Sequence, residues 1–331
     1  MKWLEQAWYR PRLAPFLYLL LPLSLLFWLL SSLRRNLYRL RILKPYRAPL
    51  PVVVVGNISV GGTGKTPAVL AIVKSLQSQG WQPAIISRGY GGQGPFPQTV
   101  SATSAASAVG DEPKLLQRRS QVPVVVAPKR RQAIEHLLQE TPNIDVVVSD
   151  DGLQHYALSR DAEIIIIDAQ RGLGNGLLLP AGPLREPAAR LKQAEWVVAN
   201  SAQHPFARFE MQLQALPWRR VKDDREIELP DGEAVIAIAG IGNPQRFFNT
   251  LKQQGIEIVE TGIFADHYAY SQVDFERFNR RYPIVMTEKD AAKCAGFAPS
   301  HWYYLPVEAQ LPDDLLTELN TALRRKYSHQ E

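Results

Sequence analysis

VVVVGNISVGGTGKTPAVLAIVKSL, residues 52–76, decides the fold of this chain. Four valines in succession predict a buried strand, because β-branched side chains favour strands. After Lys65, apolar residues recur at helical spacing, which predicts a helix. A glycine-rich turn joins the two elements. Strand, glycine-rich loop and helix in this order are typical of a domain that binds the phosphates of a nucleotide.

The glycine-rich loop reads Ser59-Val60-Gly61-Gly62-Thr63-Gly64-Lys65-Thr66. Phosphate-binding loops follow the pattern G-x-x-x-x-G-K-[ST], so a serine replaces the first glycine here. In such loops the backbone N–H groups surround phosphate oxygens, and the helix N-terminus adds a partial positive charge. We expect Lys65 to reach the β- and γ-phosphates of ATP and the Thr66 hydroxyl to bind Mg²⁺. The alternative is a glycine-rich turn with an incidental lysine.

A second anchor for Mg²⁺ is expected at the end of another strand. IDVVVSDDGLQHY (residues 144–156) ends its apolar run in Asp150 and Asp151, and AEIIIIDAQ (residues 162–170) ends its run in Asp168. Paired carboxylates suit a metal ion or a water molecule bound to it. A single carboxylate at a strand end often belongs to a turn. We therefore prefer Asp150 and Asp151 over Asp168.

Short apolar runs alternate with helical patterns through the first two thirds of the chain. Strands are predicted at residues 52–55, 84–87, 122–127, 144–148, 163–167 and 196–199, and helices at 65–79 and 129–139. Alternating strands and helices imply a mostly parallel sheet with helices on both faces. The predicted fold class is therefore α/β, of the P-loop NTPase type.

The pattern changes after residue 205. Residues 209–229 alternate polar and apolar side chains, which predicts an antiparallel ribbon. Residues 234–260 then predict a strand, a glycine turn, a helix and a second strand, and residues 282–293 predict another strand and a turn. We predict three parts: an apolar helix with a basic flank in residues 1–47, a P-loop domain in residues 48–205, and a smaller α/β domain in residues 206–331, joined through the ribbon.

The basic residues are concentrated near the N-terminus. The chain has 331 residues and a formal net charge of +6. Residues 1–47 hold nine basic residues and one acidic residue, a net charge of +8, so the other residues together carry −2. A basic excess at the flanks of an apolar segment favours an anionic lipid surface over a nucleic acid. We expect no nucleic-acid partner, and nothing in the sequence indicates an obligate protein partner.

Residues 13–33, LAPFLYLLLPLSLLFWLLSSL, contain no charged side chain. A helix needs about 20 apolar residues to cross a bilayer core. Basic residues follow densely up to Arg47, and the positive-inside rule then places the C-terminal side in the cytoplasm. A helix in the membrane interface, an apolar helix packed on the protein and a signal peptide are the alternatives. We expect a helix associated with the inner membrane, with the other domains on its cytoplasmic face.

Eight motifs in one order now resemble a known family. They are GNISVGGTGKTP, SRGYGG, VGDEP, SDDGLQH, LLLPAGPLREP, IAGIGNPQRFF, DHYAYS and TEKDAAK, which lie between residues 56 and 293. Together they resemble tetraacyldisaccharide 4′-kinase, the lipid A 4′-kinase of Gram-negative bacteria. Only the P-loop is specific by itself, but the ordered set is highly specific. The resemblance covers nearly the whole chain, and the family's loop also carries a serine where Ser59 stands.

The resemblance implies a lipid kinase. It implies transfer of the γ-phosphoryl group of ATP to the 4′-hydroxyl of tetraacyldisaccharide 1-phosphate, with ATP and Mg²⁺ as cofactors. The acyl chains of this lipid A precursor lie in the cytoplasmic membrane, so the enzyme must meet the sugar at the membrane surface. An apolar helix with a basic flank would dock the enzyme there.

The resemblance also suggests roles for single residues. It implies that Asp111, in VGDEP, is the base that accepts the hydroxyl proton, assisted by His267, in DHY. By itself, an aspartate before Glu-Pro is commonly a helix cap, and a lone histidine in a loop is commonly solvated. Glu186, in GPLRE, resembles a further acidic residue of the family's metal region. A surface pair with the preceding arginine is the simpler alternative.

Three further residues are candidates for supporting roles. Arg88, in SRGYGG, follows a strand end, where its planar fork of donors suits a phosphate of ATP or of the substrate. A structural hydrogen bond to loop carbonyls is the alternative. Gln154 and His155, in DDGLQH, are expected to support the metal carboxylates or to face the sugar.

Two other functions are consistent with a P-loop that follows an apolar segment in the sequence. A membrane-tethered ATPase or GTPase would turn over nucleotide without a lipid acceptor. A nucleotide-binding scaffold would bind nucleotide and catalyse nothing.

Overall fold

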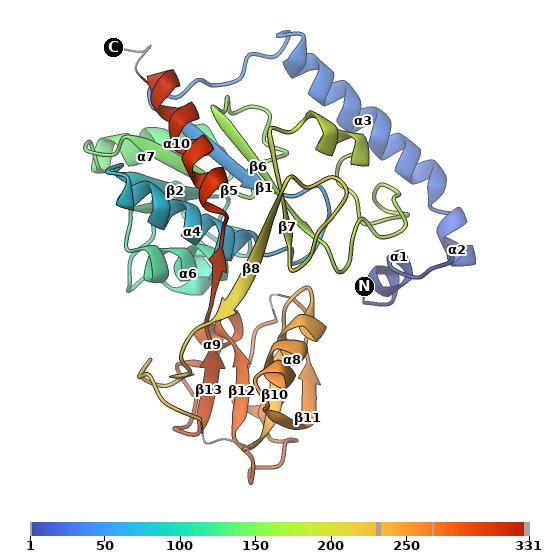
Figure 1. The fold of residues 1–331 in the computed structure, drawn as a ribbon, viewed down its shortest axis with the longest axis vertical. Helices are drawn as coiled ribbons and strands as arrows, with labels where there is room; N and C mark the ends of the chain where they lie inside the picture. Colours follow the sequence, from blue (N-terminus) through green and yellow to red (C-terminus); the bar gives the residue numbers. More distant parts are fainter. Residues whose placement is uncertain (1, 230–232, 267, 328–331) are drawn as a thin grey trace.

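The computed structural model describes residues 2–229, 233–266 and 268–327. These residues form a large lobe, a small lobe below it in Figure 1, and an N-terminal helical segment that runs along the outside of the large lobe. Each lobe is built on its own sheet. The predicted α/β class with a mostly parallel sheet and flanking helices is confirmed.

The large sheet contains the strands predicted from the valine- and isoleucine-rich runs. In spatial order its strands are β14 (Val307–Gln310), β8 (Phe209–Ala215), β7 (Trp196–Asn200), β6 (Ala162–Asp168), β1 (Val52–Gly56), β5 (Val146–Asp150), β2 (Pro83–Ser87), β4 (Val124–Val126) and β3 (Gln98–Thr99). The strands from β8 to β4 run parallel, and β14 and β3 add antiparallel edges. The strand β1 lies near the middle, so the P-loop that follows it opens at the centre of the sheet.

Helices cover both faces of this sheet because alternate side chains of a strand point to opposite faces. Val53 and Val55 belong to the core formed with α4 (Lys65–Ser78) and α10 (Asp313–Tyr327). Val52 and Val54 belong to the core on the other face, with α7 (Arg130–Glu140). The remaining helical elements of this lobe are α5 (Ala106–Val109), α6 (Asp111–Ser120) and the 3-10 helix η1 (Ala188–Gln193).

The small lobe is a second α/β unit. Its sheet has the order β11 (Glu257–Ile263), β10 (Ala234–Ala239), β12 (Ile284–Thr287), β13 (Trp302–Leu305) and β9 (Arg219–Arg220). Neighbouring strands from β11 to β13 are parallel, and β9 is antiparallel to β13. Its helical elements are α8 (Pro244–Gln253), α9 (Glu288–Cys294) and the 3-10 helix η2 (Gln272–Phe275).

The ribbon predicted within residues 209–229 has a different partner in the structure. The strand β8 does alternate buried and exposed side chains, but it pairs with β14, so that Leu213 lies opposite Ala309. Alternation shows that a strand has one buried face, but it carries no information about which strand lies beside it. The two strands are the two passages of the chain between the lobes (Figure 1).

The last helix of the chain packs on the large lobe, so the structure divides the chain differently from the predicted domain of residues 206–331. Leu315, Leu319 and Leu323 of α10 join the core that contains α4. Trp81 donates a hydrogen bond from Nε1 to Asn320 (2.8 Å), and Trp196 donates one to Glu318 (3.2 Å). The chain leaves the large lobe after β8 and returns to it through β14.

The uncharged stretch of residues 13–33 is divided between two helices. The segment begins with α1 (Lys2–Trp8) and α2 (Pro15–Tyr18), and α3 (Leu21–Arg39) starts afresh with Pro22 in its first turn. Within the residues that the structure describes, no helix combines the length and the apolarity needed to span a bilayer. Membrane association of this segment remains a prediction.

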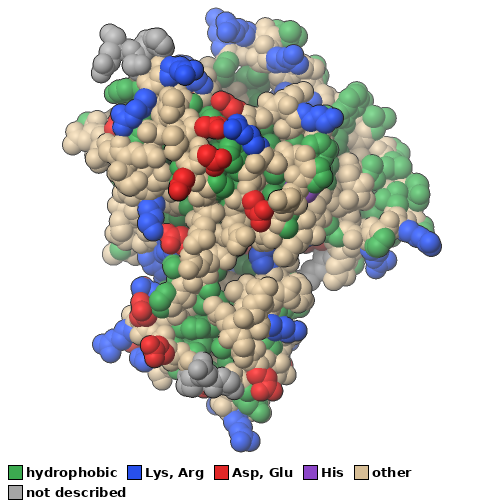
Figure 2. All heavy atoms as spheres, in the orientation of Figure 1, with side chains coloured by type: hydrophobic (Ala, Val, Ile, Leu, Met, Phe, Trp, Pro, Cys, Tyr) green, Lys and Arg blue, Asp and Glu red, His purple; other side chains and the backbone are tan. Residues whose placement is uncertain are grey.

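The helix α3 turns its polar stripe toward the protein and its apolar side chains outward. The hydroxyl of Ser24 donates to the carbonyl of Leu178 (2.9 Å) and accepts from the N–H of Ala181 (2.9 Å). The exposed large apolar side chains of this helix are Leu23, Leu25, Leu26, Trp28, Leu29, Leu30 and Leu33. Figure 2 shows hydrophobic side chains gathered along this edge of the molecule.

The placement of α10 can be tested by removing one buried side chain. The Leu319→Ala variant should lose about 2–5 kcal/mol in the free energy of unfolding of the large lobe, because a cavity opens against α4. Chemical denaturation followed by tryptophan fluorescence measures this change. Thr317→Ala, an exposed position on the same helix, is the control and should change stability little. Equal stability of the two variants would contradict the packing described here.

Candidate active site

A cleft of about 1800 Å³ lies between the two lobes. The large lobe contributes the P-loop, the ends of β2 and β5, the first turn of α6 and, from α3, Arg34 and Arg35. The small lobe contributes residues 241–247, 263–266 and 287–289. Ligands of open α/β sheets bind at the carboxyl ends of parallel strands, and the cleft lies at that edge of the large sheet.

The P-loop is held from outside by contacts to its carbonyls and amides. Gly64 begins α4 with a φ of 95°, a conformation that disfavours a side chain. A Cβ there would lie 2.8 Å from the methyl of Met211 and closer still to the side-chain amide of Asn200. That amide donates to the carbonyl of Thr63 (2.9 Å), and the N–H of Val60 donates to Pro183 (2.9 Å). The protein therefore sets the shape of the loop.

Lys65 lies in the cleft beside an acidic partner. Its ammonium is 3.6 Å from Asp151 Oδ1, and Arg185 lies 3.1 Å from Asp151 Oδ2. Burial raises the pKa of Asp151, but the charges of Lys65 and Arg185 outweigh this effect and hold the pKa below its usual value. Asp151 is thus an anion that holds two cations at the mouth of the P-loop.

Asp150 is buried more completely and differs in its charge balance. It is 2% exposed, and Ser87 donates a hydrogen bond to its Oδ2 (3.2 Å). Burial, Glu112 and Asp151 raise the pKa of Asp150 to about 7, against the opposing charges of Lys65 and Arg130. A carboxylate in this environment is stabilised in its ionised form by a bound cation.

The oxygen ligands at the end of β5 and the start of α4 fit Mg²⁺. A carboxylate and a hydroxyl, those of Asp150 and Thr66, are hard oxygen ligands, and both residues line the cleft. Among the described residues, no group of three or more His, Cys, Asp or Glu side chains is placed to hold a metal ion. Mg²⁺ in phosphoryl-transfer sites is usually bound through one or two carboxylates together with substrate phosphates and water.

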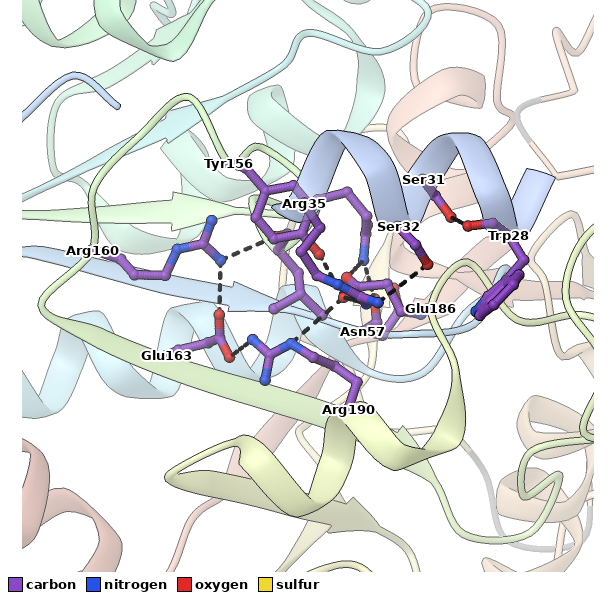
Figure 3. A network of polar contacts seen from close by, with 12 residues as sticks. Trp28, Ser31, Ser32, Arg35, Asn57, Tyr156, Arg160, Glu163, Glu186 and Arg190 are labelled. Carbon is purple, nitrogen blue, oxygen red and sulfur yellow. Dashed lines mark hydrogen bonds and ion pairs between the residues drawn. The ribbon is translucent and has the colours of Figure 1, made fainter. Parts of the chain in front are cut away.

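Glu186, predicted as a third acidic ligand, lies in a different network (Figure 3). It is 2% exposed, and it accepts hydrogen bonds from Gln154 (2.7 Å) and from the Tyr156 hydroxyl (2.6 Å). Arg35 of α3 and Arg190 lie 3.7 and 3.5 Å from its Oε2. The predicted set of Asp150, Asp151 and Glu186 does not converge on one point, because the oxygens of Glu186 are used by these neighbours.

Gln154 connects this network to the P-loop. Its amide also donates to the carbonyl of Asn57 (3.0 Å), and its oxygen accepts from Arg185 (3.4 Å). Burial, followed by the charges of Arg130, Arg34 and other arginines, lowers the pKa of His155 to about 4. His155 is therefore a neutral ring near pH 7, and both Gln154 and His155 line the cleft. Arg88 is exposed and also lines the cleft.

Asp168, the alternative metal anchor, lies between the lobes on the other side of the P-loop. Its carboxylate accepts from the N–H groups of Gln170 (3.1 Å) and Arg171 (3.3 Å) and from Asn243 (3.2 Å), and it pairs with Arg246 of α8. The oxygens of Asp168 therefore contact α8, Asn243 and the turn that follows β6.

Asp111 is the first residue of α6, and its Oδ2 lies 3.4 Å from Lys293 Nζ of the small lobe. His267 lies outside the described residues. Its neighbour Asp266 lines the cleft and accepts a hydrogen bond from Lys289 (3.0 Å). The structure thus brings Asp111 to the junction of the lobes, where Lys293 of the small lobe contacts it.

Sequence analysis missed several charged residues that the structure places at the cleft or beside it. They are Arg185, Arg130, Glu112, Lys289 and Lys293. All of them except Arg130 lie inside the quoted motifs. Their position within a motif was therefore the one sequence feature that could have identified them as residues of the site. Arg130 is buried and donates to the carbonyl of Asp150 (3.0 Å), a contact that requires the folded sheet.

The role of Glu186 can be tested by a neutral substitution. Glu186→Gln should lower the free energy of unfolding by about 1–3 kcal/mol, because it removes a buried anion that accepts hydrogen bonds beside two arginines. The loss should be the same with and without Mg²⁺ in thermal unfolding experiments. Glu195→Gln, at an exposed position, serves as the control. A loss that appears only with Mg²⁺ and nucleotide would instead identify Glu186 as a metal ligand.

Comparisons with known proteins agree with the P-loop and the two-lobed fold. A family model described as Tetraacyldisaccharide-1-P 4′-kinase matches residues 16–324. The tetraacyldisaccharide 4′-kinase of Idiomarina loihiensis is 53% identical over 324 residues, covering 98% of each protein. That of Aeromonas salmonicida is 48% identical over 318 residues, covering 96% of this chain and 95% of the relative.

The crystal structure of LpxK from Aquifex aeolicus in complex with ATP matches with a TM-score of 0.79 at 29% identity, and the match covers 94% of this chain and 99% of that chain. The resemblance seen in eight ordered motifs is thereby confirmed over nearly the whole length. This chain belongs to the tetraacyldisaccharide 4′-kinase family.

Proposed function

We propose that this chain transfers the γ-phosphoryl group of ATP to the 4′-hydroxyl of tetraacyldisaccharide 1-phosphate, a step of lipid A biosynthesis. Membership of the family supports the activity, and one observation about α3 supports the lipid acceptor. This helix exposes leucines on its outer face, while Arg34 and Arg35 line the cleft that contains the P-loop. A lipid whose acyl chains contact α3 would present its phosphorylated sugar to these arginines.

The P-loop residues position the nucleotide. Backbone N–H groups of Gly61 to Thr66 and the ammonium of Lys65 would hold the β- and γ-phosphates, since the loop opens into the cleft at the N-terminus of α4. Thr66 and Asp150 would hold Mg²⁺, with Asp151 near it, and the bound ion neutralises charge that develops on the phosphates. Asp151, which also pairs with Arg185, would keep Lys65 in the cleft.

Asp111 would act as the base for the acceptor hydroxyl. In the transfer, the O–H bond of the 4′-hydroxyl breaks and its proton passes to Asp111. The hydroxyl oxygen forms a bond to the γ-phosphorus while the bond from that phosphorus to the bridging oxygen breaks and ADP leaves. His267 would orient Asp111, as the family resemblance implies. Because Asp111 lies at the junction of the lobes, the arrangement of the lobes would control access of water.

The activity can be tested by following the label of γ-labelled ATP. Wild-type protein with Mg²⁺ and tetraacyldisaccharide 1-phosphate in detergent micelles should place the label in the lipid. Asp111→Asn keeps the shape of the side chain but removes its charge, so kcat should fall by about 100-fold or more, with the KM for ATP little changed. Release of free phosphate without a labelled lipid would favour the ATPase alternative, and full activity of Asp111→Asn would exclude this residue as the base.

The outer face of α3 also suggests where the protein lies in the cell. We propose that α3 lies in the interface of the inner membrane, with the lobes on the cytoplasmic face, where ATP is present. The outward leucines would insert among the acyl chains, and the basic residues that follow residue 33 would contact anionic headgroups.

Docking can be tested with charged substitutions on the outer face of α3. Leu26→Glu with Leu30→Glu changes two side chains that are 51% and 59% exposed and one helical turn apart. Binding to vesicles that contain anionic phospholipid, measured by sedimentation, should fall by about tenfold or more. Val259→Glu, at an exposed apolar position of the small lobe, is the matched control and should bind as wild type does. Unchanged binding of the double variant would contradict the docking proposal.

A further inference from the structure

The two lobes meet where α9 of the small lobe packs against α6 of the large lobe. Side chains of opposite charge meet at this contact. Arg118 and Arg119, in the last turn of α6, lie 2.7 and 2.6 Å from the carboxylate of Glu288. This pairing places the start of α9 on α6 and directs the next turns of α9 toward the first turn of α6.

Two lysines of α9 face the acidic first turn of α6. Lys289 lies 3.1 Å from Glu112, and Lys293, four residues later on the same side of the helix, lies 3.4 Å from Asp111. Both pairs join the TEKDAAK motif of the small lobe to the VGDEP motif of the large lobe. The proposed base is therefore in contact with a cation that the other lobe supplies.

Lys293 is buried to a degree that is uncommon for a lysine. Its side chain is 7% exposed. Its Nζ has no hydrogen-bond partner within the described part of the chain, although it is shielded from solvent. A buried ammonium is costly unless a carboxylate compensates it, and losing that partner is strongly destabilising. The burial of Lys293 thus points to the carboxylate of Asp111 as its electrostatic partner.

A second set of contacts holds Lys293 in place. Its Nζ lies 5.7 Å from the centre of the Tyr270 ring, within the range of a cation–π interaction. The Tyr270 hydroxyl donates to Asp290 (3.0 Å), and Asp290 also accepts from the N–H of Gly240 at the end of β10 (3.0 Å). These bonds tie α9 to the end of β10 in the small sheet, so the position of Nζ is fixed relative to that sheet.

We infer that Lys293 is a positioning residue for the transfer reaction: its ammonium fixes the carboxylate of Asp111 and keeps it ionised, so that it accepts the proton of the acceptor hydroxyl. The inference rests on the proposed role of Asp111 as base. Lys293 keeps its own proton throughout and does not touch the substrate. Because the pair joins two lobes, the base is complete only when α9 lies on α6.

Other charged and titratable groups surround Lys293 and Asp111, and they influence the pKa of Asp111. Within the described residues, α6 contributes Glu112, α9 contributes Lys289, Asp290 and Cys294, and the loop before η2 contributes Asp266 and Tyr270. Lys289 is occupied by Glu112 and Asp266. Burial raises the pKa of Asp290, and Lys293 opposes this shift. Removal of Lys293 therefore leaves the partly buried Asp111 and the buried Asp290 with less compensating positive charge.

The ion pair can be tested without any substrate. Protein with ¹³C-labelled aspartate carboxyl groups is titrated by NMR, and the resonance of Asp111 is assigned by its loss in Asp111→Asn. Lys293→Met, which keeps the length of the side chain but removes the charge, should raise the pKa of Asp111 by about one to three units. Lys293→Arg restores the charge and should return the pKa toward the wild-type value. An unchanged pKa in Lys293→Met overturns the inference.

Lys289→Met is the matched control in this titration, because it removes the same charge one turn earlier, opposite Glu112. It should move the pKa of Asp111 much less than Lys293→Met does. An equal shift would mean that general packing of α9 on α6, and not the Lys293–Asp111 pair, sets the pKa. Thermal unfolding of all variants verifies that they are folded before the titrations are compared.

Kinetics then test the consequence for the reaction. The acidic limb of the pH profile of kcat/KM should move upward in Lys293→Met by the same number of units as the NMR pKa, with the KM for ATP little changed. The same substitution in an Asp111→Asn background should have little further effect on kcat, since Lys293 acts through Asp111. A full additional loss in that background would overturn the inference.

The two measurements separate the inference from the proposed function. If wild-type protein labels no lipid, the proposed function fails, while the NMR titration still decides whether Lys293 controls the charge of Asp111. If the lipid is labelled and the pKa of Asp111 does not depend on Lys293, the function stands and the inference fails.

Discussion

The structure depends on one steric constraint at Gly64. At this position the backbone turns into α4 with a positive φ, and Asn200 and Met211 occupy the space that a side chain would need. Because Asn200 ends β7, the loop is shaped by a strand that is distant in sequence. Lys65 and Thr66 follow directly, so their direction into the cleft depends on the same packing. The rest of the site is arranged around phosphates that this loop would hold.

Charge is distributed around the cleft so that the buried carboxylates named here lie beside specific cations or donors. Asp151 pairs with Lys65 and Arg185, while Asp150 lies beside it in a setting that raises its pKa. Glu186 is enclosed by arginines, one of which comes from α3. Burial makes these pairings selective, since an uncompensated charge is far more costly inside than at the surface. The helix that exposes leucines to the outside therefore also contributes a cation to the network behind the P-loop.

Much of the fold could be predicted, because its signals are local. The run of valines that became β1 and the glycine-rich loop after it specify a strand and a turn within a few residues. The partner of β8 could not be predicted, because alternation along Phe209–Ala215 carries no information about β14, which lies far along the chain. For the same reason the predicted domain of residues 206–331 includes α10, because the leucines of this helix form an apolar face but do not show which core covers it.

Local patterns are enough to predict the class of the fold, the P-loop, the acidic pair Asp150 and Asp151 at the end of a strand, and the family. The contacts of each carboxylate become visible only in the folded protein. Folding places Glu186 among arginines and tyrosine, Asp168 against the small lobe, and Asp111 beside Lys293. The physical reason is distance along the chain. A motif consists of residues that are neighbours in the sequence. The charge of a carboxylate such as that of Asp111 depends on side chains such as Lys293, which lies more than a hundred residues away and which only folding brings close.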